Sequence, residues 1–161
     1  MVRRHGRQNA RRTAMTAIRK ATIVRPEDRE AVPTGAGGDI YATLASGAET
    51  DAGYFLTHAI VPPGGGPPAH VHTREEEAFY LIRGELVFLV GAEEVRVGAG
   101  SFVNVPKGLK HRFRNDGAVE AELLFWFAPA GIEGLFRELG ETPERIVEIG
   151  EKYGTSYFFE G

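Results

Sequence analysis

The stretch that decides the fold is residues 69–84, Ala-His-Val-His-Thr-Arg-Glu-Glu-Glu-Ala-Phe-Tyr-Leu-Ile-Arg-Gly. His70 and His72 stand two residues apart in an extended run, so both side chains leave the same face of a strand, about 6–7 Å apart. Glu77 opens the apolar strand that follows, where a buried carboxylate is costly without a partner. Two imidazoles and a carboxylate in this arrangement can converge on one ion.

A third histidine, His111, follows a turn in which Pro106 fixes φ and Gly108 permits positive φ. Each residue has an ordinary structural explanation when it is read alone: a buried or surface histidine, a solvated acidic run over 75–77, a basic strand edge around His111. Together they supply three imidazoles and a carboxylate, a set that suits a divalent first-row transition metal. The chain has no cysteine, so His, Asp or Glu must hold any metal.

The composition indicates one globular domain rich in turns. The chain has 161 residues, enough for a single compact domain. Hydrophobic residues make up 42% and charged residues 25%, which excludes a disordered chain. Glycine contributes 21 residues and proline 9, so the chain turns often. Short apolar runs alternate with turn signals from residue 40 onward, a pattern typical of an all-β barrel or sandwich.

The strands expected from these runs cover residues 40–45, 54–61, 69–72, 77–83, 85–90, 95–97, 101–105, 111–115 and 119–127. A loop is expected over Pro62–Pro68, because prolines and glycines cannot supply the hydrogen bonds of a central strand.

Beyond the strands, helical spacing predicts one helix from Ile132 to Leu139, closed by Gly140. A second helix follows, with Thr142 as its N-cap and Pro143 as its first residue, and Gly154 ends it. The aromatic tail 157–159 is expected to dock on the barrel or on a second subunit.

Charge is distributed unevenly along the chain. Residues 1–20 hold seven basic residues and no acidic one, while the remainder carries 12 basic against 22 acidic residues. A folded region with this excess of acidic residues is a poor surface for binding nucleic acid. No apolar run approaches the ~20 residues of a membrane span, and the basic start lacks an apolar signal core. We therefore expect a soluble, cytoplasmic protein that binds neither nucleic acid nor membrane. The basic start is expected to be a flexible tail or sequence upstream of a true start at Met15, the alternatives being a binding arm or an organellar presequence.

Two motifs resemble those of the cupin superfamily. The first, H-x-H-x4-E-x6-G, is filled by His70, His72, Glu77 and Gly84. The second, G-x5-P-x-G-x2-H-x3-N, is filled by Gly100, Pro106, Gly108, His111 and Asn115. The fifteen residues between Gly84 and Gly100 suit the short spacing of single-domain bacterial cupins. The resemblance covers residues 40 to about 129.

This resemblance implies a double-stranded β-helix, or jelly roll, over residues 21–130, after a basic tail over 1–20 and before a short helical extension over 131–161. It also implies one divalent transition metal in the barrel. Ligands of this kind accept Fe, Mn, Co, Ni, Cu or Zn, so the metal is not readable from the sequence. The four ligands implied are His70, His72, Glu77 and His111.

Alternation predicts which side chains share the metal's face. If Glu77 points inward, so do Phe79 and Leu81, and Phe113 follows His111. With Trp126, these three residues are predicted to form the substrate pocket or simply to fill the barrel. An apolar, aromatic wall suits a planar ligand better than a sugar phosphate. The sequence does not say which face of its strand His58 occupies, and a role on the outer sheet or at the edge of the core is favoured over a fifth ligand.

Among cupins, the chain resembles quercetin dioxygenase-type proteins in the Pro-Pro-Gly loop at 62–64 and the Phe-Arg-Glu-Leu-Gly helix at 136–140. This implies a dioxygenase of an aromatic, flavonol-like or enolisable hydroxylated small molecule, with the substrate hydroxyl and O2 at the metal. Glu77 would be both ligand and general base. Two alternatives stay open: a non-catalytic sensor or carrier, and an isomerase or lyase of a small hydroxylated acid. A homodimer is expected, since the aromatic tail needs cover.

Overall fold

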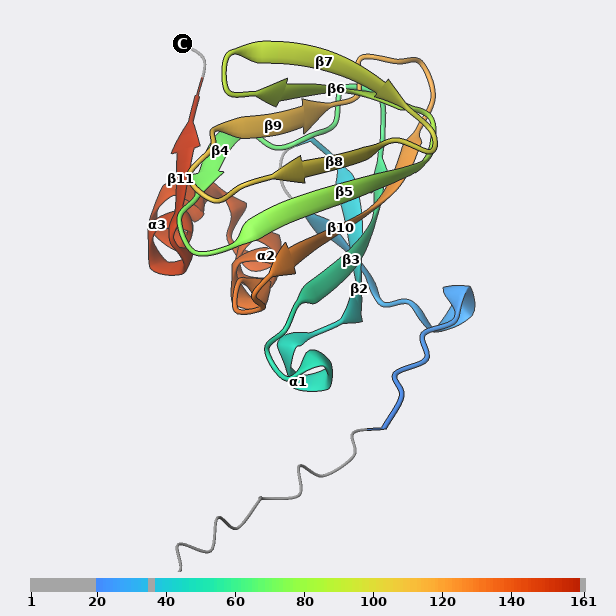
Figure 1. Cartoon of the computed structure of the whole chain (residues 1–161), viewed down its shortest axis with the longest axis vertical. Coiled ribbons are helices and arrows are strands. Elements are labelled where there is room, and N and C mark those ends of the chain that lie inside the picture. Colours follow the sequence, from blue (N-terminus) through green and yellow to red (C-terminus); the bar gives the residue numbers. More distant parts are fainter. Residues whose placement is uncertain (1–19, 35–36, 160–161) are drawn as a thin grey trace, which may run out of the picture.

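The computed structural model describes residues 20–34 and 37–159 (Figure 1). The basic tail predicted over residues 1–20 lies outside the described residues except for Lys20, and so does Met15. None of the helices within the described ranges is long and apolar enough to cross a membrane.

Two antiparallel sheets face each other and enclose the core, which confirms the predicted all-β, jelly-roll fold (Figure 1). The first sheet has the order β1 (Ala31–Thr34), β2 (Asp39–Ala45), β3 (Phe55–Val61), β10 (Ala121–Ala128), β5 (Glu76–Arg83) and β8 (Phe102–Val105). The second has the order β11 (Thr155–Phe158), β4 (Ala69–His72), β9 (His111–Arg114), β6 (Glu85–Val90) and β7 (Glu93–Gly98).

All nine predicted strands are present, with ends that differ by at most two residues from the prediction. Two strands were not predicted. β1 contains Pro33, which is tolerated because β1 lies at the edge of its sheet. β11 is a four-residue edge strand that, among the described strands, pairs with β4 alone. The sequence did not predict it because its apolar run is short and directly follows a helix.

The helices are short. α2 (Glu133–Glu141) and α3 (Ile146–Tyr153) lie together beside one end of the barrel, while α1 (Gly47–Thr50) lies in the connection between β2 and β3, and 3-10 turns cover Pro26–Asp28 and Pro143–Arg145 (Figure 1). The second helix begins later than predicted. Pro143 starts a 3-10 turn, and the Thr142 hydroxyl donates to the carbonyl of Glu138 instead of capping a helix. Gly154 ends α3 as predicted, but α2 runs past Gly140.

The core lies between the inward faces of the two sheets. In β5, Phe79 and Leu81 are buried while Tyr80 and Ile82 are exposed, which is the predicted alternation. The Phe79 ring packs edge-on against Phe88 of β6, with centroids 5.0 Å apart. Burying a phenylalanine of this kind contributes about 1.5–3 kcal/mol, so such pairs hold the sheets together.

The loop over Pro62–Pro68 lies against the end of β9. Gly64 N–H donates to the carbonyl of Asn115 at 2.8 Å, and Asn115 N–H donates to that of Gly65 at 3.0 Å. Gly66 has φ +126°, and a Cβ there would stand 2.2 Å from the carbonyl oxygen of Phe113. Only glycine permits so close an approach. The loop is thereby fixed beside the strand that carries His111.

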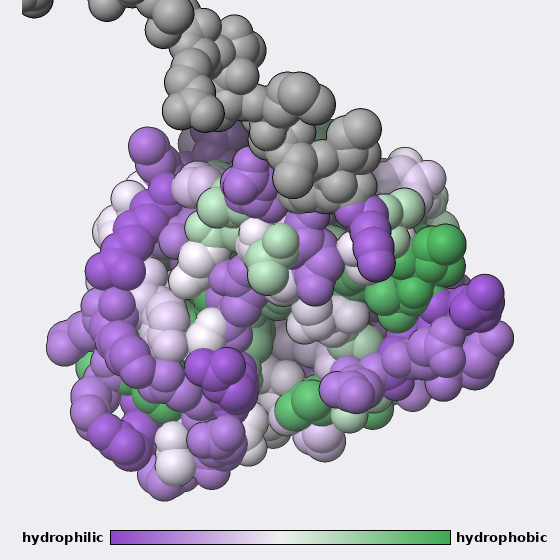
Figure 2. Space-filling model, turned by 90° about the horizontal axis from the view of Figure 1, so that it is seen from below, coloured by the Kyte–Doolittle hydropathy of each residue, from purple (hydrophilic) through white to green (hydrophobic). Residues whose placement is uncertain are grey.

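The lower end of the molecule is largely polar. On the face shown in Figure 2, hydrophilic side chains cover most of the surface and hydrophobic ones form small separate groups.

Candidate metal centre

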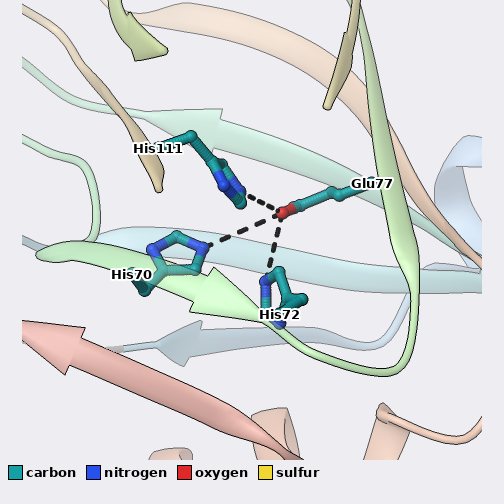
Figure 3. Close-up of side chains that lie close together, drawn as sticks. All are labelled: His70, His72, Glu77 and His111. Carbon is teal, nitrogen blue, oxygen red and sulfur yellow. Dashed lines mark hydrogen bonds and ion pairs between the residues drawn. The ribbon is translucent and has the colours of Figure 1, made fainter. Parts of the chain in front are cut away.

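Four buried side chains from three strands meet inside the barrel (Figure 3). β4 supplies His70 and His72 from one face, β5 supplies Glu77, and β9 supplies His111. Their Nε2 atoms lie 3.8, 3.2 and 2.8 Å, respectively, from Oε2 of Glu77. All four ligand atoms lie within 4.8 Å of one another. The four side chains named by the two motifs are thus brought together at one point.

The other nitrogen of each histidine is held in place. His70 Nδ1–H donates to the carbonyl of Pro68 at 2.8 Å, and His111 Nδ1–H donates to that of Leu109 at 2.9 Å. His72 Nδ1 lies 3.0 Å from the hydroxyl oxygen of Thr155. Because a carbonyl can only accept, Nδ1 carries the proton in His70 and His111. In the neutral rings the Nε2 lone pair then points to the centre, the arrangement of metal-binding histidines.

The protonation of the cluster follows from burial and from these contacts. Burial raises the pKa of Glu77, but hydrogen bonds from His111, His70 and His72 outweigh it and hold that pKa well below its ordinary value. Burial lowers the pKa of His70. For His111, burial also acts downward, but the hydrogen bond and charge of Glu77 raise its pKa overall. Glu77 is therefore ionised, and it attracts positive charge to the centre.

The donor set fits a transition metal ion. His72 Nε2 is buried, and among the described residues its only polar contact is with Oε2 of Glu77 at 3.2 Å, which lacks the geometry of a full hydrogen bond. Three converging imidazole nitrogens and a carboxylate oxygen repel one another unless a proton or a cation lies between them. Imidazole and carboxylate donors suit Fe, Mn, Co, Ni, Cu and Zn alike. The cluster could therefore hold one such ion, whose identity the ligands do not select.

A cavity of about 620 Å³ adjoins the cluster, and His70, His72 and Glu77 form part of its wall. This volume lies within the range of small-molecule sites. Seven aromatic residues contribute to the remaining wall: Tyr41 of β2, Phe113 of β9, Phe125 and Phe127 of β10, Phe136 of α2, Tyr157 of β11 and Phe159 after it.

The predicted wall residues lie in three different places. Phe113 lines the cavity. Phe79 and Leu81 share the face of Glu77 but lie deeper in the core, because each step of two residues moves about 6–7 Å along the strand. Trp126 points to the outer face of β10 and stacks on Phe102, with centroids 5.8 Å apart. This corrects the expectation that Trp126 faces the metal.

Phe125 and Phe127, on the other face of β10 from Trp126, are two of the cavity residues that the sequence did not reveal. The run Leu-Leu-Phe-Trp-Phe is apolar on both faces, so its alternation cannot say which side is inward. The sequence holds one weak signal of the orientation of β10: the charged Glu122, near the start of the strand, lies on the outer face. His58 lies on that outer face too, 2.7 Å from Glu122, and is not a ligand.

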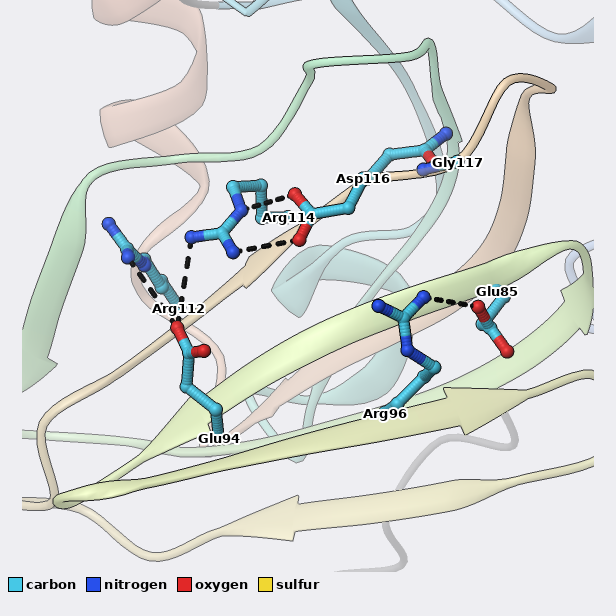
Figure 4. A network of polar contacts seen from close by, with 8 residues as sticks. Glu85, Glu94, Arg96, Arg112, Arg114, Asp116 and Gly117 are labelled. Atoms are coloured by element: carbon cyan, nitrogen blue, oxygen red, sulfur yellow. Dashed lines mark hydrogen bonds and ion pairs between the residues drawn. The ribbon is translucent and has the colours of Figure 1, made fainter.

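The basic residues of β9 do not place unpaired charge in the cavity. Arg112 and Arg114 contribute atoms to its rim. Their guanidinium groups lie 3.9 and 3.7 Å from Glu94, and Arg114 also pairs with Asp116 at 2.8 Å (Figure 4). Both arginines at the rim therefore already have carboxylate partners.

One polar group in the wall is tied to the loop over Pro62–Pro68. The Tyr41 hydroxyl donates to Asp39 Oδ2 at 2.9 Å, and the Gly66 N–H donates to Oδ1 at 3.0 Å. Burial raises the pKa of Asp39 and, with the charge of Asp39, raises that of Tyr41 well above its ordinary value. Asp39 thus joins β2 to the loop beside the cavity.

Residues 57–127, which contain all four clustered side chains, match the family described as "Cupin domain". Protein SchB of Streptomyces halstedii is 37% identical over 97 residues, covering 58% of this chain and 67% of that protein. The chain belongs to the cupin family. The tetracenomycin polyketide synthase protein TcmJ of Streptomyces glaucescens is 34% identical over 93 residues, covering 58% of this cupin and 62% of TcmJ.

Other proteins are similar to this cupin at lower sequence identity. Quercetin 2,3-dioxygenase of Bacillus subtilis is 25% identical over 108 residues, 67% of this cupin but only 32% of that enzyme. Among solved structures, a predicted oxalate decarboxylase from Thermotoga maritima has a TM-score of 0.60 at 26% identity, over 66% of this cupin and 98% of that chain. The polyketide cyclase RemF from Streptomyces resistomycificus has a TM-score of 0.59 at 21% identity, over 68% and 80% of the two chains, which shows the shared fold alone.

Proposed function

We propose that this cupin is a metal-dependent dioxygenase of a planar, hydroxylated aromatic molecule of flavonol or catechol type. The observation that carries this proposal is the cluster of three histidines and Glu77 beside a cavity of about 620 Å³, with seven aromatic residues in the cavity wall. The similarity to quercetin 2,3-dioxygenase supports it. In such a reaction both atoms of O2 enter the substrate, which itself supplies the electrons, so no external reductant is needed.

His70, His72 and His111 would hold the metal through Nε2, and Glu77 through Oε2. The metal supplies open coordination positions for a substrate hydroxyl and for O2. The pKa of Glu77 lies well below its ordinary value, so this side chain is ionised at neutral pH and able to accept a proton. Glu77 would take the proton of the substrate hydroxyl, acting as general base as well as ligand.

The remaining walls orient the substrate. Phe113, Phe125 and Phe127 offer ring faces and edges from two neighbouring sheets, and aromatic pairs of this kind favour planar ligands. The arginines at the rim are paired with carboxylates, which disfavours a sugar phosphate. We propose Phe113, Phe125 and Phe127 as the substrate wall in place of Phe79, Leu81 and Trp126.

Oxygen uptake tests this function. Metal-free protein is reloaded separately with Fe(II), Mn(II), Co(II) or Ni(II), and quercetin or catechol is added under air. Uptake above that of the metal-free protein, with two ¹⁸O atoms from ¹⁸O2 in the product, is the expected result. No uptake with any of these metals and substrates, at full metal loading, would sink the dioxygenase assignment.

A second candidate is a cyclisation or isomerisation of a polyphenolic polyketide without O2. Two polyketide synthase proteins, TcmJ at 34% and CurC at 31% identity, are closer in sequence to this cupin than quercetin 2,3-dioxygenase is, at 25%. The same assay separates the candidates. Turnover without oxygen uptake, giving a product of equal mass or one water lighter, indicates the second. Tight binding of the substrate without turnover indicates a carrier or sensor instead.

We also propose a homodimer formed through the outer face of the first sheet. Tyr80, Ile82 and Phe102 are exposed there. Light scattering should give twice the mass of one chain, and a charge on that face near its β8 edge, Phe102→Glu, should shift the mass toward the monomer. A monomeric wild type would overturn this proposal.

A further inference from the structure

The strand β11 lies outside the segment 57–127 that matches the cupin family, yet it reaches the metal centre. It pairs with β4 so that Thr155 stands opposite His72 and Tyr157 opposite His70. On the other side of β4, His111 is also opposite His70. Tyr157, His70 and His111 therefore form one row across three strands, since opposite residues present their side chains on the same face.

The Tyr157 ring is held between α3 and β4. Its centroid lies 5.7 Å from that of His70. On the other side is Gly150 of α3, where an added Cβ would stand 2.8 Å from the ring. Glycine is a poor residue for a helix interior, and this close approach accounts for its presence. The ring of Tyr157 is thus placed by packing on both sides.

The hydroxyl of this side chain is not used by the protein. Tyr157 lines the cavity, and its hydroxyl has no hydrogen-bond partner among residues 20–34 and 37–159. Tyr41, the other tyrosine of the wall, differs because its hydroxyl is bonded to Asp39. A tyrosine hydroxyl in a half-buried position ordinarily has a partner, and a protonated phenol is a hydrogen-bond donor.

We propose that Tyr157 donates a hydrogen bond to a second oxygen of the substrate, next to the oxygen that binds the metal. This rests on the proposed function only in requiring a substrate that coordinates the metal through oxygen. It narrows the substrate class to molecules with two neighbouring oxygens, such as catechols and hydroxyketones. A simple phenol would leave the Tyr157 hydroxyl without an acceptor. Tyr157 is on this view a specificity-determining residue contributed by the C-terminal extension.

The test compares two probes on cobalt-loaded protein without oxygen. 4-Nitrocatechol carries two neighbouring oxygens and 4-nitrophenol one, and the binding of each is followed by its visible absorption. Tyr157→Phe keeps the ring and removes the hydroxyl. We expect about tenfold weaker binding of 4-nitrocatechol, no change for 4-nitrophenol, and unchanged cobalt content. Tyr54→Phe, at an exposed position before β3, is the matched control and should change neither.

Three results would count against the inference. Equal 4-nitrocatechol affinity in Tyr157→Phe overturns it directly. A loss of bound cobalt, or an equal loss for both probes, assigns Tyr157 a structural role in packing His70 and overturns it as well. If the wild-type protein binds cobalt but neither probe, the proposed function itself fails, and the inference falls with it. That last outcome is recognised before any variant is made.

Discussion

The strands β9 and β11 flank the same strand, β4, and each sets one side chain beside His70. The side chain from β9 is His111, which belongs to a motif of fixed spacing over residues 100–115. The side chain from β11 is Tyr157, which belongs to no motif. The metal ligands can therefore be recognised from motifs of fixed local spacing. The position of Tyr157 instead depends on the pairing of β11 with β4, between residues more than eighty positions apart in the sequence.

The two strands also differ in how they are supported. β9 lies between β4 and β6, inside its sheet. β11 is an edge strand, and beyond its pairing with β4 it depends on α3, which buries Ile149 against the core. Edge strands open more readily than central ones, because fewer contacts hold them. Changes on β9 should accordingly act on whether metal binds, and changes on β11 on how its ligands are oriented.

The largest effect is expected at Glu77, which faces both strands. Glu77→Gln keeps an oxygen that can bind metal but removes the proton acceptor. Turnover should fall about 10²–10⁴-fold, the usual contribution of a general base, with a much smaller loss of metal affinity. Steady-state rates and metal analysis of the same preparation measure the two. Parallel losses would show that Glu77 is a ligand only.

The next largest effect is expected from the β9 ligand. His111→Ala removes one of the four metal ligands. Loss of a group that only orients a ligand already lowers metal affinity about 10–100-fold. Bound metal after dialysis should therefore fall to less than about a tenth of the wild-type content. His58→Ala is the control, because His58 is a buried histidine bonded to Glu122 outside the centre. Full metal content in His111→Ala would remove the site assignment.

The β11 counterpart is Thr155. Its hydroxyl lies 3.0 Å from His72 Nδ1, so Thr155→Val keeps the shape and removes the contact that orients the ring. Metal affinity should fall about tenfold, and Thr155→Ser should restore it. Competition with a chromophoric chelator measures both. If Thr155→Val and Thr155→Ser have the same metal affinity, β11 only packs against β4 and does not orient the His72 ring. The proposed difference between β9 and β11 would then be wrong on this point.

The sequence predicts the fold and the cluster well for one physical reason. Strand periodicity is local, so the spacing of His70 and His72 places them on one face before any partner is known. The same reasoning predicts Tyr80 and Ile82 as outward residues, and the structure confirms this.

What the sequence does not predict is set by long-range packing. The apolar run of β10 reads alike on both faces, so Trp126 was assigned inward when Phe125 and Phe127 are the inward residues. The aromatic tail was expected only to dock somewhere, because nothing local tells that Tyr157 pairs with His70. Gly150 was the one trace of that contact, since glycine inside a helix signals a close neighbour.

The smallest effect is expected from pH, and it separates β9 from β11 once more. The contact with Glu77 raises the pKa of His111 overall, so this ring carries a proton at a higher pH than an ordinary histidine does. A metal needs the neutral ring, and binding therefore releases that proton. Burial lowers the pKa of His70, so protons compete with the metal for this ring only in more acid solution.

Metal affinity should thus fall as the pH falls from 7 to 6, by up to tenfold per pH unit while one proton is released. Calorimetry in two buffers of different ionisation enthalpy counts that proton. Thr155→Val should lower the affinity without changing its slope against pH, because a threonine does not titrate. His111→Ala should flatten the slope for whatever metal it still binds. A slope that flattens in Thr155→Val instead would contradict the assignment of the released proton to His111.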